Sequence, residues 1–410
     1  MQTIHWVGTG LSAIPGIKKL IQDGHQIIVW NRTVQTAKVA LQNFNVEIQE
    51  FSMDKLKTQL NSNDILVSML PGEWHVPLAN LCLEKKSHFV SSSYISPEML
   101  DLNQKFIELN LSCVNEVGLD PGIDHAMAHY LVEDLKSHDL DSDISIDFIS
   151  YCGGVPKTPN PFRYKFSWSP AGVLKALKSP SKSIKNGMEW NVERPWDAIT
   201  SYVAPLPEPE KFEVYPNRDS LPFISQYNFN QEWNIHQFVR GTLRLQGWAD
   251  AWSDVFKEIE NLSFPEGDAR LQEMSNNFWK ENAYDEGEPD RVILCVSLKA
   301  NKNNSPLYHK TYVLDAWGTN ESTAMARLVS IPVAKAVELI KSGEIMTGVS
   351  STPDSPNIVR KWMDMVSSLC QHLEIIDHLK KLKIDYHLRY SIFCLYCPLS
   401  LQLFFLPFRA

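Results

Sequence analysis

The run GTGLSA, residues 8–13, constrains the fold more than any other part of the sequence. It follows the apolar run IHWV directly and opens a segment whose apolar residues have helical spacing. In this pattern Gly8 permits a tight turn, Gly10 lets the backbone approach a pyrophosphate, and the small Ala13 allows close packing of helix on strand. The helix N-terminus then offers free N–H groups to phosphates. The pattern predicts the first βαβ unit of a dinucleotide-binding domain, with a plain strand-turn-helix as the alternative.

The end of the second predicted strand distinguishes between the two nicotinamide dinucleotides. Asn31, Arg32 and Thr33 stand where NAD-binding folds place an acid for the ribose hydroxyls. An acid would repel a 2′-phosphate, whereas Arg32 can pair with it through two hydrogen bonds and Asn31 and Thr33 can donate further ones. We therefore expect NADP. The structural alternative for Arg32 is a solvated loop arginine.

Apolar patterning divides the rest of the chain. Up to residue 122, short apolar runs rich in Val, Ile and Phe alternate with amphipathic segments, which predicts an α/β fold with a doubly wound parallel sheet. From residue 123 to about 320 the sequence is aromatic, proline-rich and alternating, which favours a second, mixed or antiparallel domain. Residues 320–342 have helical spacing closed by Gly343, and this helix is expected to pack back on the first domain.

Composition narrows the class of partner. Lys and Arg number 39 against 48 Asp and Glu, a net charge of -9, which opposes attraction to nucleic acid or an anionic membrane. We expect a small-molecule partner. The seven scattered cysteines indicate reduced thiols, and no export signal is visible at the N-terminus, so we expect a cytoplasmic protein.

The C-terminal run, residues 391–408, is compositionally unusual. It is almost long and apolar enough to span a membrane, but Pro398 interrupts it and Pro407 ends it. We expect an extension without membrane association, and a tail anchor is the alternative. Cys394 and Cys397 have no neighbouring Cys/His pair, so no metal site is predicted.

Three segments follow the carboxyl ends of predicted parallel strands, the edge at which such sheets bind ligands: LPGEWH, SSSYISPEM and NEVGLDPGIDH. Together with YCGGVP, YKFSWSPAGVL, YPNRD and RGTLRLQG, the last two of these segments resemble the glutamate-forming saccharopine dehydrogenases, also called saccharopine reductases. The resemblance covers residues 3–350. It implies the NADP-dependent interconversion of saccharopine and water with glutamate and 2-aminoadipate 6-semialdehyde, in lysine metabolism.

The resemblance also implies an architecture: a Rossmann domain, an inserted α/β domain for substrate and dimerisation, and C-terminal helices returning to the first domain. We place these at residues 1–122, 123–320 and 321–375, with an atypical tail over residues 376–410. Proteins of this type are often dimers, so a homodimer is expected.

Carried over by position, the resemblance implies two overlapping sets of site residues. The expected cofactor contacts are Gly8, Gly10, Leu11, Ser12, Ala13, Asn31, Arg32, Thr33, Ser92, Ser93, Leu119, Asp120, Pro121 and Ser167. The expected substrate contacts are Ser93, Tyr94, Asp120, Arg218, Thr242, Leu243 and Arg244.

The chemistry of saccharopine suggests roles for these residues. Its three carboxylates require fixed cations, for which Arg218 and Arg244 are candidates, with structural salt bridges as the alternative. Proton transfers are needed at the amine nitrogen and at water. Asp120 and Tyr94 are the expected catalytic residues. For Asp120 the alternative is a turn or helix-cap aspartate, and His125 is a second candidate for the proton transfer.

Two other functions are compatible with these residues. One keeps the fold and NADP but acts on another N-(carboxyalkyl) amino acid, since any polycarboxylate would need the two arginines. The other is a catalytically silent NADP-binding regulator.

Overall fold

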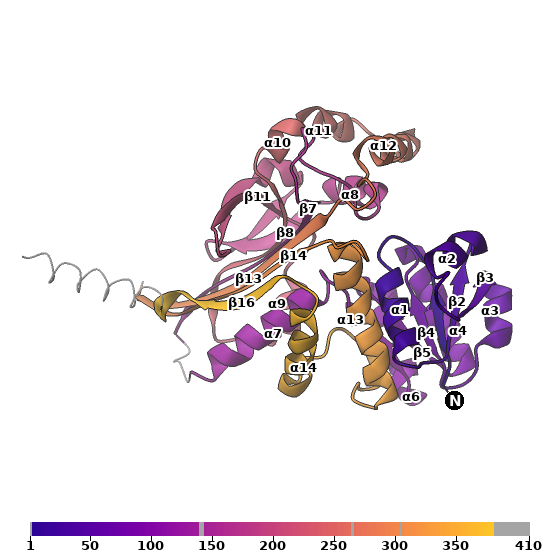
Figure 1. The fold of residues 1–410 in the computed structure, drawn as a ribbon. Helices are drawn as coiled ribbons and strands as arrows, with labels where there is room; N and C mark the ends of the chain where they lie inside the picture. Colours follow the sequence, from indigo (N-terminus) through magenta and orange to yellow (C-terminus); the bar gives the residue numbers. More distant parts are fainter. Residues whose placement is uncertain (1, 139–142, 264–265, 304, 381–410) are drawn as a thin grey trace, which may run out of the picture.

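In a computed structural model, two β-sheets organise the part of the chain that the structure describes (Figure 1). The structure describes residues 2–138, 143–263, 266–303 and 305–380. The predicted apolar run over residues 391–408, with its two cysteines, lies outside the described residues. Within the described part of the chain, no helix is both long enough and apolar enough to cross a membrane.

Among the described residues, the first sheet has seven strands in the order β15-β6-β5-β4-β1-β2-β3, and every neighbouring pair is parallel. The strands are β1 (Ile4–Val7), β2 (Ile27–Asn31), β3 (Glu47–Glu50), β4 (Ile65–Ser68), β5 (His88–Ser91), β6 (Ser112–Val114) and β15 (Gly348–Ser350). Most are short apolar runs, and β1, β4 and β6 are buried along their whole length, as expected of parallel strands covered on both faces. The strand order reverses between β1 and β4, which is where such sheets bind ligands.

Short helices connect these strands: α1 (Ile14–Gln22), α2 (Val34–Ala40), α3 (Met53–Gln59), a 3₁₀ turn (Gly72–Trp74), α4 (His75–Lys85), α5 (Pro97–Leu100) and α6 (Asn103–Glu108). Local sequence explains some of their boundaries. Ser52 and Ser96 cap α3 and α5, because each serine hydroxyl accepts a hydrogen bond from a backbone N–H of the first turn.

The second sheet is mixed and has nine strands within the described residues. Its strands are β7 (Ser145–Pro156), β8 (Ser181–Lys185), β9 (Met188–Val192), β10 (Thr200–Ala204), β11 (Glu210–Pro216), β12 (Asn234–Leu245), β13 (Asp290–Lys302), β14 (Ser305–Trp317) and β16 (His372–Asp377). The central strand β7 pairs in parallel with β12 and antiparallel with β13. The α/β fold with a parallel sheet and a second, mixed sheet is therefore confirmed.

An aromatic cluster supports one end of the mixed sheet. The helical elements of this region are α8 (Pro170–Leu177), a 3₁₀ turn (Pro195–Ala198), α9 (Pro222–Gln226), α10 (Trp248–Ala251), α11 (Ser253–Glu260) and α12 (Glu266–Asn282). Figure 1 shows α8, α10, α11 and α12 together at the end of the sheet. Their core includes Tyr164, Phe166, Trp248 and Trp252, all almost completely buried.

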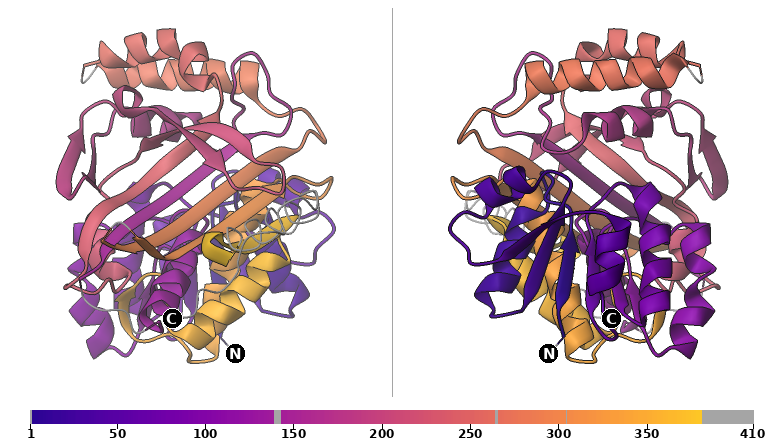
Figure 2. Two further views of the ribbon diagram at one scale, coloured as in Figure 1. Left: turned by 90° about the vertical axis from the view of Figure 1, so that its left-hand side faces the viewer. Right: turned by 90° about the vertical axis from the view of Figure 1, so that its right-hand side faces the viewer.

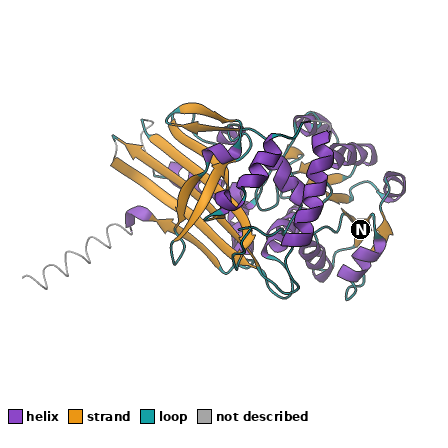
Figure 3. Cartoon of the chain, turned by 90° about the horizontal axis from the view of Figure 1, so that it is seen from above, coloured by secondary structure: helices purple, strands orange, loops and turns teal. Residues whose placement is uncertain are grey.

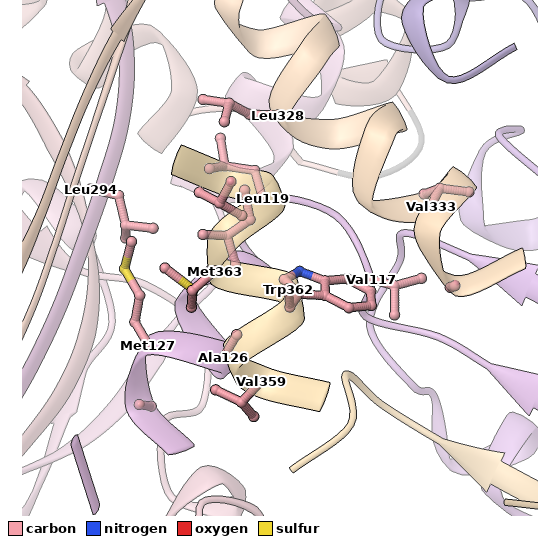
Figure 4. Close-up of a cluster of buried hydrophobic side chains, with 14 of the residues drawn as sticks. Val117, Leu119, Ala126, Met127, Leu294, Leu328, Val333, Val359, Trp362 and Met363 are labelled. Atoms are coloured by element: carbon pink, nitrogen blue, oxygen red, sulfur yellow. The ribbon is translucent and has the colours of Figure 1, made fainter. Parts of the chain in front are cut away.

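Three helices join the two sheets: α7 (Ile123–Lys136), α13 (Ala324–Lys341) and α14 (Pro356–Ser367). Helix α13 packs against α1, and α14 packs against α7 (Figure 2). Seen from above, most strands of the mixed sheet lie on one side of the molecule, and the parallel sheet with the N-terminus lies on the other (Figure 3). Trp362 of α14 lies among Val117, Val333 and Met363 in a core that both sheets share (Figure 4).

The C-terminal part contains strands in addition to the helices that were predicted over residues 321–375. The predicted long helix is present as α13, capped by Thr323 and followed by Gly343 with a φ of 71°. However, β15 extends the parallel sheet beside β6, and β16 extends the mixed sheet beside β14. Strand β16 also continues past residue 375. These strands are short and pair with residues far away in sequence, so they carry no local periodic signal. The four-part division into domains stays a prediction.

Candidate functional site

A cavity of about 810 Å³ lies where the glycine loop, the ends of β4, β5 and β6, and strands of the mixed sheet meet. Of the predicted site residues, those that line it are Gly10, Leu11, Ser12, Ala13, Ser92, Ser93, Tyr94, Leu119, Asp120, Pro121, Arg218, Thr242 and Arg244. Those that do not line it are Gly8, Asn31, Arg32, Thr33, Ser167 and Leu243. Segments more than 200 positions apart therefore contribute to one site.

The glycine loop has the geometry of a phosphate site. Gly8 has a φ of 101°, and a Cβ there would lie 3.0 Å from the carbonyl oxygen of Met69, so the turn requires glycine. A Cβ at Gly10 would meet no heavy atom within 4 Å, which leaves room for a ligand at the backbone. Among the described residues, no acceptor is found for the N–H groups of Gly10, Leu11 and Ser12. Free N–H groups at a helix N-terminus fit a pyrophosphate.

The loop after β2 is tied to the glycine loop by Asn31. The Asn31 side-chain oxygen accepts a hydrogen bond from the backbone N–H of Thr9 at 3.1 Å, and its amide donates to the carbonyl of Thr33 at 2.9 Å. Arg32 is exposed and forms no ion pair with any described residue. Its guanidinium is therefore available to a 2′-phosphate, and the residues present fit NADP(H).

Two arginines face the cavity without a carboxylate partner among the described residues. Arg218 follows β11, and its guanidinium lies 5.0 Å from the centre of the Tyr94 ring. Arg244 of β12 is buried, with its guanidinium 4.8 Å from the Tyr164 ring centre, and its Nε has no acceptor among the residues that the structure describes. A buried guanidinium that lacks a counter-ion needs an anion. Arg244 therefore leaves an uncompensated buried positive charge at the cavity, and the exposed Arg218 adds a second one.

Leu243 and Ser167 occupy different positions from those expected. Side chains alternate along β12, so Thr242 and Arg244 face the cavity while Leu243 is fully buried in an apolar cluster with Val239 and Cys295. Any contact of Leu243 with substrate would have to be made by its backbone. Ser167 is buried next to Trp168 and Ser169, which do line the cavity.

Arg240 holds the acidic groups of the site, and the sequence analysis did not select it. Its Nη2 donates to the Oδ1 of Asp120 and to the Oδ2 of Asp124, both at 2.6 Å, and lies 3.2 Å from the hydroxyl oxygen of Tyr94. The Tyr94 hydroxyl in turn donates to Asp120 at 3.0 Å. Its spacing in the sequence could have identified it, because Arg240 is four positions before Arg244 and so lies on the same face of β12.

Burial and neighbouring charges shift the pKa values of the two carboxyl groups of this network in opposite directions. Burial raises the pKa of Asp120, and the neighbouring Asp124 carboxylate raises it further. Burial would also raise the pKa of Asp124, but His125 and Arg240 bring it below the usual value. Of the two, Asp124 therefore favours the ionised form, and Asp120 takes up a proton more readily. Burial raises the pKa of Tyr94 well above its usual value, so Tyr94 remains a phenol that can donate.

Two histidines lie near the site in different roles. His75, from the LPGEWH segment, has its Nε2 2.7 Å from Ser93 Oγ and its Nδ1 3.0 Å from Ser68 Oγ. Burial lowers the pKa of His75 to about 4, so this imidazole is neutral and orients the Ser93 hydroxyl. His125 does not line the cavity; it is buried, with Nδ1 2.7 Å from the Tyr227 hydroxyl oxygen and Nε2 3.2 Å from a Glu116 carboxylate oxygen.

Sequence profiles of two protein domains match the chain. The saccharopine dehydrogenase NADP binding domain matches residues 4–114, and the saccharopine dehydrogenase C-terminal domain matches residues 118–369. Together the two matches include every predicted site residue.

Similar proteins agree with these profiles. The saccharopine dehydrogenase [NADP(+), L-glutamate-forming] of Pyricularia oryzae is 27% identical, with 84% of this chain and 92% of that protein covered. The mitochondrial alpha-aminoadipic semialdehyde synthase of Rattus norvegicus is 28% identical over 74% of this chain, which spans only 40% of that longer protein. In structure, the apo saccharopine dehydrogenase (L-Glu forming) of Saccharomyces cerevisiae has the same fold, with a TM-score of 0.75, 23% identity, and 92% and 100% of the two chains covered.

Proposed function

Because the chain belongs to the saccharopine dehydrogenase family, we propose that it interconverts saccharopine and water with glutamate and 2-aminoadipate 6-semialdehyde, using NADP(H). It is an NADP-dependent oxidoreductase acting on a CH–NH bond of a small molecule, in lysine metabolism. The observation that supports this substrate best is the pair of arginines, Arg218 and Arg244, that face the glycine-loop cavity and have no carboxylate partner in the described part of the chain. Neither alternative function named from the sequence is favoured by the similar proteins.

The cofactor contacts proposed from the sequence fit the structure of the loops. NADP(H), when bound, accepts or supplies the hydride. The free N–H groups from Gly10 to Ser12 would hold the pyrophosphate, and Arg32, with Asn31 and Thr33, would hold the 2′-phosphate. We assign to the nicotinamide end the residues Ser92, Ser93, Leu119, Asp120 and Pro121, and we keep Ser167 as a further cofactor contact.

The two arginines and the hydroxyl groups of the cavity would orient saccharopine. Arg218 and Arg244 each offer parallel N–H donors to a carboxylate, and Ser93 and Thr242 add hydroxyl groups beside them. Fixing the carboxylates in this way sets the position of the secondary amine. Part of the binding energy therefore serves to orient the reacting C–N bond.

Asp120 would take the proton that the amine releases and return it in the reverse direction. Its raised pKa suits this exchange, because a general base works best when its pKa lies near the operating pH. Tyr94 keeps the carboxylate oriented by donating to Oδ1, and Arg240 compensates its charge. Asp124 stays ionised and stabilises Arg240.

For the protein in the cell we propose a homodimer in the cytoplasm. The described cysteines are free and four of the five are buried, which suits a reducing compartment. The partly exposed Ile149, Tyr202 and Ile376 pack against the apolar cluster of the mixed sheet and would be covered by a second copy. Light scattering tests the dimer, which predicts twice the chain mass of 46.8 kDa, and microscopy of the tagged full-length protein tests the compartment.

Saccharopine-dependent reduction of NADP, followed by the absorbance of NADPH, tests the reaction. We expect turnover with saccharopine and much weaker turnover with other N-(carboxyalkyl) derivatives of lysine or ornithine. Arg244→Gln should lower kcat/KM for saccharopine about 10- to 150-fold, since a charge-assisted hydrogen bond contributes about 1.5–3 kcal/mol. The affinity for NADPH should be unchanged. No saccharopine-dependent signal at millimolar substrate would contradict the proposal.

A further inference from the structure

Three aromatic rings surround the guanidinium of Arg244, one of the two arginines that face the glycine-loop cavity. The guanidinium lies 4.8 Å from the ring centre of Tyr164, 5.4 Å from that of Trp248 and 5.7 Å from that of Tyr215. All three distances are within the range of about 6 Å in which a ring face attracts a cation. None of these three residues is more than 5% exposed, so water competes little with the attraction. We call the three residues the aromatic cage.

The turn after β12 folds part of the cage over the guanidinium. Gly247 has a φ of 86°, a backbone conformation that favours glycine, and α10 then begins with Trp248, four positions after the arginine. Tyr215, on the neighbouring strand β11, stacks on Trp248 with the ring centres 5.3 Å apart and the ring planes at 16°. The Tyr164 hydroxyl accepts a hydrogen bond from Nε1 of Trp168 at 3.2 Å. Contacts outside the arginine therefore fix the positions of the rings.

No carboxylate of the described residues forms an ion pair with Arg244. Glu213 of β11 lies opposite it in the register of the two strands, but the Glu213 carboxylate serves another group. Its two oxygens accept hydrogen bonds from the backbone N–H groups of Gly247 and Ala249, both at 2.8 Å. Nη1 of Arg244 donates to the carbonyl oxygen of Leu243 at 3.1 Å, which is an uncharged acceptor. The positive charge of Arg244 is thus held at the cavity and not neutralised.

Arg240 provides the contrast, because it lies on the same face of the same strand. It is also buried, but Asp120 and Asp124 each accept a hydrogen bond from its Nη2 at 2.6 Å and compensate its charge. A ring face carries only a partial negative charge, so it attracts a guanidinium without cancelling its charge. The charge that remains on Arg244 interacts strongly with a carboxylate in a site from which water is excluded. Strand β12 therefore presents one compensated arginine and one whose charge is available to a ligand.

We propose that the aromatic cage positions Arg244 for substrate binding: its ring faces hold the guanidinium in the orientation in which it binds a carboxylate of the substrate. Tyr164, Tyr215 and Trp248 are then positioning residues, which act on the substrate through the arginine. The inference rests on the proposed function, because the carboxylate is one of the three of saccharopine. It requires that the affinity for saccharopine depend on the electron density of the ring faces as well as on their shape.

Fluorination of Trp248 separates electron density from shape, because each fluorine atom withdraws electron density from the ring face and adds little volume. We would place tryptophans with one to four fluorine atoms at position 248 of the full-length protein. Saccharopine binding is then measured by calorimetry at saturating NADPH. Both ligands are in the reduced state, so no hydride passes and binding is measured without turnover. The logarithm of the dissociation constant should rise in proportion to the number of fluorine atoms, to a total weakening of about 2- to 30-fold.

Trp252 is the matched control. Its ring centre lies 5.2 Å from that of Trp248, but within the described part of the chain it makes no cation–π contact with Arg244. The same fluorinated residues at position 252 should leave the dissociation constant unchanged. The melting temperature of each fluorinated protein, measured in parallel, should match that of the parent.

Two ordinary substitutions give a second measurement. Trp248→Phe and Trp248→Leu both shorten the side chain, and Nε1 of Trp248 has no hydrogen-bond partner among the described residues that either change would remove. The ratio of their affinities therefore isolates the ring face. The phenylalanine variant should bind saccharopine at least about twofold more tightly than the leucine variant.

The outcomes distinguish the cage from the reaction. A dissociation constant independent of the number of fluorine atoms, or an equal change at positions 248 and 252, would overturn the role of the cage and leave the proposed reaction intact. Absence of turnover in a parent protein that binds saccharopine would contradict the reaction alone, and the fluorine series would still decide on the cage. A parent protein that binds no saccharopine would contradict both.

Discussion

At the scale of single residues, we expect a substitution of the buried Arg240 to have a large effect on stability. Its guanidinium holds Asp120 and Asp124 in a site from which water is largely excluded, and it lies 4.0 Å from the centre of the Phe223 ring. Replacing it leaves two buried carboxyl groups without a counter-charge. Arg240→Leu should therefore lower the free energy of unfolding by about 3–5 kcal/mol, measured by urea denaturation.

An exposed arginine provides the control for that measurement. Arg194 pairs with Asp197 and Glu260 at the surface, where solvent screens the charges. The urea midpoint of Arg194→Leu should equal that of the parent protein within experimental error. A loss of stability as large as that of Arg240→Leu would contradict the role given to the buried network.

Asp120 should set the acid limb of the pH profile in the direction of saccharopine oxidation. The carboxylate must be ionised to take a proton, so kcat/KM rises with pH through the pKa of Asp120, which lies above the ordinary aspartate value. Asp120→Asn should lower kcat about 10²- to 10⁴-fold and remove this limb.

Tyr94→Phe separates orientation from proton transfer. The Tyr94 hydroxyl donates to Asp120 and lowers its pKa, so the phenylalanine variant should keep the acid limb but shift it to higher pH. A limb unchanged in both variants, measured by initial rates across the pH range, would assign the proton transfer to another group.

The residues of the site differ in how far sequence could predict them. Tyr94, Asp120, Arg218 and Arg244 are recognisable because they belong to unusual strings of residues, and all four line the cavity. Arg240 was missed because a central role for one guanidinium depends on which carboxylates fold toward it. The inward or outward direction of Leu243 depends on the register of β12 with β7 and β11, which the sequence alone does not determine.

At the scale of elements, the close approach of α1 and α13 depends on Gly16. Its backbone N–H donates to Ser330 Oγ at 2.8 Å, and an added Cβ would overlap the Ser330 carbonyl oxygen and lie 2.8 Å from the Trp6 ring. Gly16→Ala should therefore force the helices apart and destabilise the protein by about 1–3 kcal/mol. Thermal denaturation measures this effect.

Gly72→Ala is the matched control for that substitution. A Cβ at Gly72 would meet no heavy atom within 4 Å, so the melting temperature should stay close to that of the parent protein. Equal effects of the two substitutions would show that the contact between α1 and α13 is not the cause.

The elements that sequence predicted best are those with a local signal. Strands β1, β2 and β4 are apolar runs bounded by turns, and α13 has 18 residues of helical periodicity. Strands β15 and β16 were missed because each is stabilised by a partner strand more than 50 positions away. Pairing of that kind is determined by the tertiary fold, not by the propensity of a short run.

At the scale of the whole molecule, the two sheets share one apolar core. Residues of β1 and β4, of α7, α13 and α14, and of β13 pack in the same cluster. We expect a single calorimetric unfolding transition instead of one for each sheet. NADPH at 100 times its dissociation constant should add about 2.7 kcal/mol to the stability of the whole molecule. Two transitions, only one of which moves with NADPH, would contradict this prediction.

The contact between Gly16 and Ser330 also bears on how the chain is made, because these residues are 314 positions apart. The nucleotide-binding sheet leaves the ribosome without α13 on its surface and without β15 beside β6. Until most of the chain has been synthesised, the sheet presents an open edge and an apolar helix face, both of which favour association with other chains. The order of the elements therefore leaves the nascent chain prone to association over that interval.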